Sequence, residues 1–189
     1  MKNKMKKIII SLGIIMFMCT LNLNAQEENN LEIGGQMLTY PKVEWIKGTP
    51  VTQFHKDSIY VVELWATWCV PCIMAMPHLN GLNKKFKDKI IFIAQGVWEE
   101  SKTKVEQFVQ KKGDGLSLRV AFSGSNGSAF DKEWCIPAGV TGIPCTFVIQ
   151  DNKLVWQTRP DKLNEEVLQL LIDGKFTIEA AEAIVQKNQ

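Results

Sequence analysis

The chain has 189 residues, of which 46% are apolar, so it is long enough to bury the core of one ordinary domain. It carries 22 basic and 20 acidic residues, a formal net charge of +2. The sequence has no basic patch of the kind that binds nucleic acid, so we expect no nucleic-acid partner.

The N-terminal segment, residues 1–25, has the three parts of a secretory signal peptide. MKNKMKK carries four lysines, an apolar run follows over residues 8–21, and the small residue Ala25 ends the segment. The run has 14 residues, which is short for a bilayer span. We therefore expect cleavage after Ala25 and a mature protein in the periplasm or another extracytoplasmic space. A lipoprotein modified at Cys19 and an uncleaved membrane anchor stay open as alternatives.

Cleavage would change both the charge and the cysteine count. It removes four lysines and no acid, which leaves 18 basic against 20 acidic residues and a net charge of −2. The cysteines that remain are Cys69, Cys72, Cys135 and Cys145. An exported chain can keep disulfides, so all four can pair, in three different connectivities.

The rest of the chain predicts one domain. Residues 26–39 are polar at their start and contain two glycines, which predicts a flexible lead-in, and residues 40–189 form the domain. Apolar and β-branched runs predict strands at 43–46, 59–66, 89–96 and 116–122, followed by a hairpin of 146–150 and 154–157. Apolar residues three and four apart predict helices at 70–86, 101–112, 163–172 and 177–187, with a short helical turn at 129–134 and an irregular segment at 137–144.

The alternation of strands and helices predicts an α/β fold. Strands joined by helices favour a mostly parallel sheet with helices on both faces, and the late hairpin adds an antiparallel pair. The 59–66 run is apolar throughout except for one acid, Glu63, which suits a central strand that is covered on both faces.

Two cysteines, Cys69 and Cys72, stand three residues apart at the start of the 70–86 helix. That spacing puts them on one face of the helix, within reach of a disulfide. Pro71 is tolerated between them because the first N–H groups of a helix have no partner within it. The helix N-terminus favours a thiolate at Cys69, so we expect Cys69 to be the exposed nucleophile. Cys72, shielded one turn into the helix, would resolve the mixed disulfide.

Glu63 lies six residues before Cys69 and needs an explanation. Burying a carboxylate alone costs several kcal/mol, so a buried Glu63 should have a raised pKa. An acid beneath the second thiol can take the Cys72 proton as that thiol attacks, which makes Glu63 the candidate proton acceptor. The alternative is that the strand lies at a sheet edge and Glu63 faces water.

Together these residues resemble a known family. Residues 63–72 read ELWATWCVPC, Pro77 follows Cys72 by five residues, and VTGIP occupies residues 140–144. Over about residues 40–173, the sequence is similar to the thioredoxin superfamily, and within it to the exported TlpA/ResA-like thiol–disulfide oxidoreductases. The resemblance implies a thioredoxin fold, a central mixed β-sheet flanked by four helices, here with an N-terminal extension and an extra C-terminal helix.

The resemblance also implies the remaining site residues. The Ile143–Pro144 bond would be cis, and Pro144 would pack against the redox pair. The Ile143 backbone would pair with an extended client segment, and Glu63 falls where the family has its buried acid. Trp68 would line the client surface, although a partly exposed packing residue would look the same in the sequence.

The other two cysteines depart from the family pattern. Cys145 follows Pro144, where threonine is common, and Cys135 lies ten residues earlier. A second disulfide between Cys135 and Cys145 would clamp the proline loop. Equally, each can be a small buried apolar residue, so both interpretations stay open.

The CxxC motif alone does not say whether the protein reduces or forms disulfides in its clients. Val70 and Pro71 place no charge or side-chain donor between the thiols, which favours a reductase of envelope-protein disulfides over a disulfide-donating oxidase. The partners would be client proteins, apocytochrome c among the candidates, and a membrane thiol–disulfide protein that supplies electrons. We expect a monomer that needs no cofactor.

Two other classes are weaker. Four cysteines suit Zn²⁺ or Cu(I), but Cys135 and Cys145 form no second CxxC, and the two histidines, His55 and His78, are typical of surface residues. We therefore predict no metal site. A peroxiredoxin would carry threonine or serine three residues before its nucleophile, where this chain has Ala66.

Overall fold

The computed structural model describes residues 29–188. The predicted signal peptide, its cleavage site and the lipidation alternative at Cys19 lie outside the described residues. Within residues 29–188, no helix is both long enough and apolar enough to cross a membrane.

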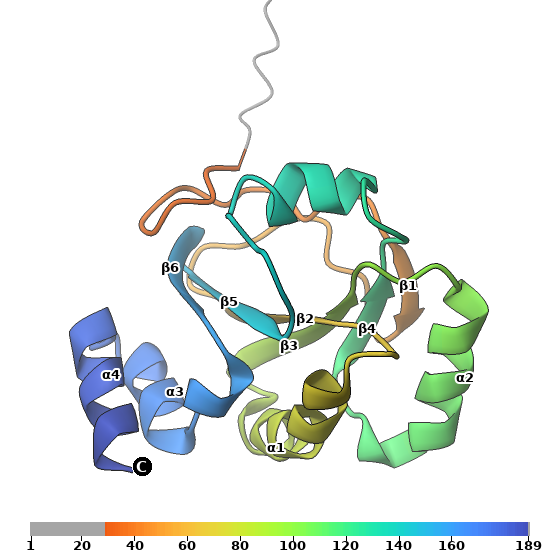
Figure 1. The fold of residues 1–189 in the computed structure, drawn as a ribbon. Helices are drawn as coiled ribbons and strands as arrows, with labels where there is room; N and C mark the ends of the chain where they lie inside the picture. The colour runs from red at the N-terminus through yellow and green to blue at the C-terminus, as the bar shows by residue number, and fades with distance from the viewer. Residues whose placement is uncertain (1–28, 189) are drawn as a thin grey trace, which may run out of the picture.

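Six strands form one mixed sheet in the order β1-β4-β3-β2-β5-β6 (Figure 1). Their bounds are β1 Glu44–Lys47, β2 Ile59–Trp65, β3 Ile90–Gly96, β4 Arg119–Phe122, β5 Cys145–Gln150 and β6 Lys153–Thr158. Strands β2, β3 and β4 are parallel neighbours, while β5 runs antiparallel to both β2 and β6, and β1 is antiparallel to β4. Strand β2 is therefore central, and all seven of its residues are buried.

Four α-helices accompany the sheet: α1 Val70–Phe86, α2 Lys102–Lys112, α3 Glu165–Ile172 and α4 Ile178–Lys187. Helices α2, α3 and α4 begin at side-chain caps, since Ser101, Asn164 and Thr177 each accept a hydrogen bond from a backbone N–H three residues on. Short helical turns are η1 Gly113–Gly115, η2 Asp131–Cys135 (a π-helix) and η3 Pro160–Lys162. The α1 helix continues through Pro77 to its predicted end.

The two faces of the sheet are covered differently. Apolar side chains of all four α-helices pack with Val61 and Trp65 on one face. The crossovers β2–α1–β3 and β3–α2–β4 join parallel neighbours and move in one direction across the sheet. Crossovers of the usual right hand then put α1 and α2 on the same side. The N-terminal segment and η2 cover the other face, as Figure 1 shows above the sheet. Within residues 29–188, all four α-helices thus lie on one face and only the short helix η2 covers the other, so the prediction of helices on both faces holds only through η2.

An aromatic cluster fills the second face. The rings of Tyr40, Phe54 and Trp134 lie within 6 Å of one another, centroid to centroid, and the Phe130 ring lies tilted with its centroid 5.1 Å from that of Trp134. Helix η2 supplies Trp134, so it is packed into the core rather than lying on the surface as a loose loop.

The prediction of a flexible lead-in over residues 26–39 is wrong for the part that the structure describes. Met37 is fully buried and Leu31 nearly so. The backbone adds hydrogen bonds to the edge of β6, from the N–H of Gly34 to the Leu154 carbonyl at 2.7 Å and from the N–H of Leu154 to the Gly35 carbonyl at 3.0 Å. The polar composition of the segment did not reveal that Leu31 and Met37 are buried, or that the extended backbone covers the edge of the sheet.

Candidate active site

The site is built at the turn between β2 and α1. The N–H of Cys69 donates to the Ala66 carbonyl at 3.1 Å, so residues 66–69 form a closed turn. Cys69 is then the N-cap of α1, and its Sγ accepts from the N–H of Cys72 at 3.3 Å. Pro71 occupies the first turn of the helix, as the sequence predicts.

Cys69 and Cys72 form a disulfide, with 2.03 Å between the sulfurs and 5.3 Å between the Cα atoms. Their side chains are 3% and 2% exposed, so the expectation of an exposed Cys69 is wrong for this oxidised form. The cover comes from a distant part of the chain, because the Ile143 carbonyl oxygen lies 3.7 Å from Cys69 Sγ.

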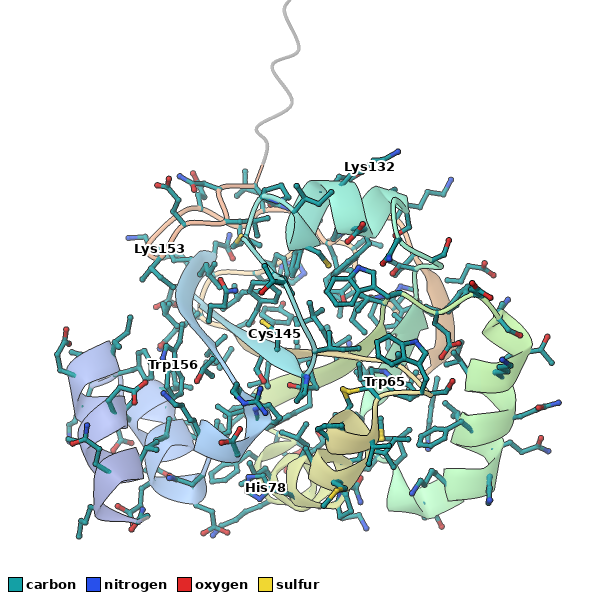
Figure 2. The ribbon with its side chains drawn as sticks, in the orientation of Figure 1. Trp65, His78, Lys132, Cys145, Lys153 and Trp156 are labelled. Carbon is teal, nitrogen blue, oxygen red and sulfur yellow. A yellow bond between two sulfur atoms is a disulfide. The ribbon has the colours of Figure 1, made fainter. Side chains whose placement is uncertain are left out.

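The Ile143–Pro144 peptide bond is cis, which confirms the expectation from the resemblance. Pro144 is buried and leads directly into β5, where Cys145 pairs with Leu64 of β2. This register brings the proline loop to the end of β2 that carries the redox turn. In Figure 2, Cys145 marks the start of β5 near the centre of the molecule, with Trp156 of β6 further toward α3 and α4.

Glu63 is buried, at 3% exposed, in the central strand, so the edge-strand alternative is wrong. It lies on the same face as Val61 and Trp65, the face that α1 covers. The Thr146 hydroxyl donates to its Oε2, while Oε1 is buried with no hydrogen-bond partner among residues 29–188. Burial raises the pKa of the Glu63 carboxyl well above its usual value, against smaller opposing effects of the Thr146 hydrogen bond and the Arg159 charge.

Trp68 is 58% exposed beside the disulfide, and its indole N–H donates to the Trp98 carbonyl at 2.9 Å. Val70 and Met74 of α1 are also strongly exposed, whereas Met76 is buried in the core. Three large apolar side chains within five residues of Cys69, those of Trp68, Val70 and Met74, are therefore exposed.

Cys135 and Cys145 do not pair in the structure: both are free and buried. Burial raises the pKa of Cys135 to about 12 and that of Cys145 to about 11. Of the two interpretations, the structure favours small buried residues over a second disulfide. Among residues 29–188, no three side chains of the His, Cys, Asp or Glu type gather into a group that could hold a metal ion.

Two polar residues at the site, Glu99 and Thr67, were not predicted. Glu99 is 3% exposed, and its Oε2 accepts from the Thr67 backbone N–H at 2.8 Å and from the Thr67 hydroxyl. A signal was present in the sequence: Glu99 lies three residues after the end of an apolar strand, and the carboxyl ends of neighbouring parallel strands meet at one edge of the sheet. Residues that follow β2 and β3 are therefore expected to meet.

Comparison with known proteins shows what this chain is similar to. The thioredoxin family model matches residues 49–112, from before β2 to the end of α2. The match covers 64 of the 189 residues, so this part of the chain is similar to a thioredoxin domain. It is 26% identical over 155 residues to protein FixW of Rhizobium leguminosarum, covering 78% of this chain and 69% of the relative. It is 24% identical over 148 residues to the thiol–disulfide oxidoreductase ResA of Bacillus thuringiensis, covering 77% of this chain and 80% of the relative.

Solved structures agree on the fold. The thioredoxin domain of a thiol–disulfide oxidoreductase from Bacteroides vulgatus superposes with a TM-score of 0.55 at 17% identity, covering 74% of this chain and 98% of that domain. The predicted thioredoxin-like fold, with its mixed sheet flanked by helices, is confirmed. The matched residues 49–112 contain the redox turn, and of the two relatives ResA is named a thiol–disulfide oxidoreductase.

Proposed function

We propose that this chain is an exported thiol–disulfide oxidoreductase that reduces disulfides of envelope proteins through Cys69 and Cys72. The observation that carries the proposal is the Cys69–Cys72 disulfide at the N-terminus of α1, with the Ile143 carbonyl 3.7 Å from Cys69 Sγ. A disulfide that closes so short a loop adds little stability, which favours a redox role over a structural one.

In the reduced protein, the Cys69 thiolate attacks one sulfur of a client disulfide and releases the other sulfur as a thiolate. The N-terminus of α1 and the N–H of Cys72 stabilise the negative charge on Cys69 before the attack. The product is a mixed disulfide between Cys69 and the client.

Cys72 then attacks Cys69 Sγ, which releases the second client thiolate and closes the Cys69–Cys72 disulfide. Two electrons pass to the client, and a dithiol partner must return two electrons for the next cycle. Cys72 must lose its proton to attack, and Glu63 supports the role of acceptor because it is an acid buried on the face that α1 covers.

The client would lie against the proline loop. An open groove of about 650 Å³ runs between the loop of residues 139–144 and the end of β6 at residues 156–159. An extended client segment that pairs with the Ile143 backbone would continue into this groove. Trp68, Val70 and Met74 would contact it on the other side of the disulfide.

The test is a Cys72→Ser variant of the full chain, expressed in its own host. It should accumulate mixed disulfides through Cys69, and mass spectrometry of the captured proteins would identify the clients. A Cys69→Ser variant is the matched control and should capture none. Capture by neither variant, or disulfide reduction by Cys69→Ser, would overturn the mechanism.

Two further readouts decide direction and location. Cells that lack the protein should accumulate the clients in oxidised form if it is a reductase, and in reduced form if it is an oxidase. A mature protein that begins at Gln26 would establish cleavage after Ala25, whereas retention of residues 1–25 would contradict it.

A further inference from the structure

The turn that carries Cys69 is held at both of its central residues by two consecutive residues of the loop after β3. Thr67 donates its backbone N–H and its hydroxyl to Glu99 Oε2. Trp68 donates its indole N–H to the Trp98 carbonyl. The turn is therefore fixed from outside as well as by its own hydrogen bond.

Glu99 is itself anchored. Its backbone N–H donates to the Gly124 carbonyl at 3.1 Å, and its side chain is almost fully covered. A buried carboxylate oxygen that accepts two hydrogen bonds from one residue holds that residue in both position and orientation. Glu100, the next residue, is exposed and makes no hydrogen bond or ion pair with residues 29–188, so the pair offers a matched comparison.

Trp98 has a backbone φ of 51°, in the left-handed region that favours glycine. Its side chain compensates, because the indole N–H donates to Asp131 Oδ1 at 2.8 Å. Asp131 Oδ2 in turn accepts from the N–H of Gly127 at 2.7 Å. The segment from Gly124 to Asp131 thus supports both residues that hold the turn.

We propose that Glu99 and Trp98 are positioning residues that fix the turn of residues 66–69, and so set the geometry and the reducibility of the Cys69–Cys72 pair. This inference rests on the proposed function, in which that pair is the redox centre. It names two residues that act through Thr67 and Trp68 rather than by touching a client.

The direction of the effect follows from two causes that act together. A loose turn would hold Cys69 and Cys72 together less well, which weakens their disulfide relative to the dithiol. The negative charge of the Glu99 carboxylate, close to the turn, disfavours a thiolate on Cys69. Loss of Glu99 should therefore make the disulfide easier to reduce.

The experiment equilibrates the full chain with dithiothreitol mixtures of defined ratio and measures the reduced fraction of the Cys69–Cys72 pair. For Glu99→Ala we expect the equilibrium to shift about tenfold toward the dithiol, or about 30 mV for this two-electron couple. Glu99→Gln keeps an acceptor for Thr67 and should shift it only about threefold in the same direction. Glu100→Ala should leave it unchanged.

A Glu99→Ala protein that is folded and less stable, but has an unchanged equilibrium, would overturn the proposal, since a merely structural role predicts that result. If Glu99→Ala does not fold, the same equilibrium is measured on Thr67→Val, which removes only the hydroxyl that donates to Glu99. We expect a shift of about threefold, and no shift would overturn the proposal.

The measurement also separates the two proposals. The equilibrium is read on the cysteine pair itself, without a client. Failure to reduce any protein disulfide would contradict the proposed function and leave the shift intact, whereas an unchanged equilibrium in active variants would contradict only the positioning role.

Discussion

Glu63 and Thr146 face each other across β2 and β5, and the Thr146 hydroxyl donates to the buried Glu63 carboxyl on the side of the sheet that α1 covers. The hydroxyl satisfies one oxygen and leaves the other buried without a partner among residues 29–188. That arrangement keeps an acid of raised pKa inside the protein, on the face of the sheet that α1 covers, and it leads to the first two predictions.

The first prediction concerns the second chemical step. Glu63→Gln removes the proton acceptor and keeps the shape and the Thr146 contact, so resolution of a mixed disulfide by Cys72 should slow about 100-fold near pH 7. The attack by Cys69 should be nearly unaffected. Single-turnover kinetics with a preformed mixed disulfide measures the step. Glu106→Gln, an exposed change on α2, is the control, and equal slowing of both steps would contradict the role of Glu63.

The second prediction concerns stability and pH. Because burial raises the pKa of Glu63, the folded protein holds this proton more tightly than the unfolded chain does. Binding of this proton therefore adds to the free energy of unfolding. The added free energy is fully present below the usual carboxyl pKa and is lost as pH rises through the raised pKa of Glu63. The oxidised Glu63→Gln protein should therefore gain free energy of unfolding relative to the parent as pH rises from 4 to 9. Urea unfolding across this range measures the difference, and a constant difference would contradict the raised pKa.

How far the sequence predicts the site depends on how local the interactions are. Cys69, Cys72 and Pro71 lie within one helical turn, so spacing alone was enough to predict them. Glu63 was found because one acid interrupts an apolar strand, and burial is the simplest consequence of that pattern. Ile143 and Pro144 came from the family resemblance, since nothing in their own segment shows which part of the chain they contact.

The interactions that were missed all depend on strand order. Glu99 meets Thr67 only because β2 and β3 are parallel neighbours, and Trp98 meets Asp131 only because η2 folds back over the sheet. The low exposure of Cys69 likewise depends on the Ile143 carbonyl, more than seventy residues away in the chain. Composition predicts a flexible lead-in over residues 26–39, since periodicity in so short a segment cannot reveal that Leu31 and Met37 are buried.

The third prediction concerns the two buried thiols. Alkylating reagents attack the thiolate, and burial raises the pKa of Cys135 to about 12 and of Cys145 to about 11. In the reduced, folded protein at pH 8, iodoacetamide should modify Cys69 and spare both of them. Peptide mass spectrometry distinguishes the sites, and modification of both after unfolding in urea is the control. Failure to modify them even when unfolded without reductant would mean that they are paired.

The last prediction concerns the N-terminal segment. Met37 is fully buried in the apolar core on the second face of the sheet, so Met37→Ala should lower the free energy of unfolding by about 2–5 kcal/mol through lost burial and a cavity. Ile33 lies in the same segment but is 52% exposed, so Ile33→Ala should cost no more than about 0.5 kcal/mol. Urea unfolding of the two variants gives the comparison. Equal, small losses would mean that the segment does not contribute to the core, and the domain would then begin near residue 40 as the composition suggested.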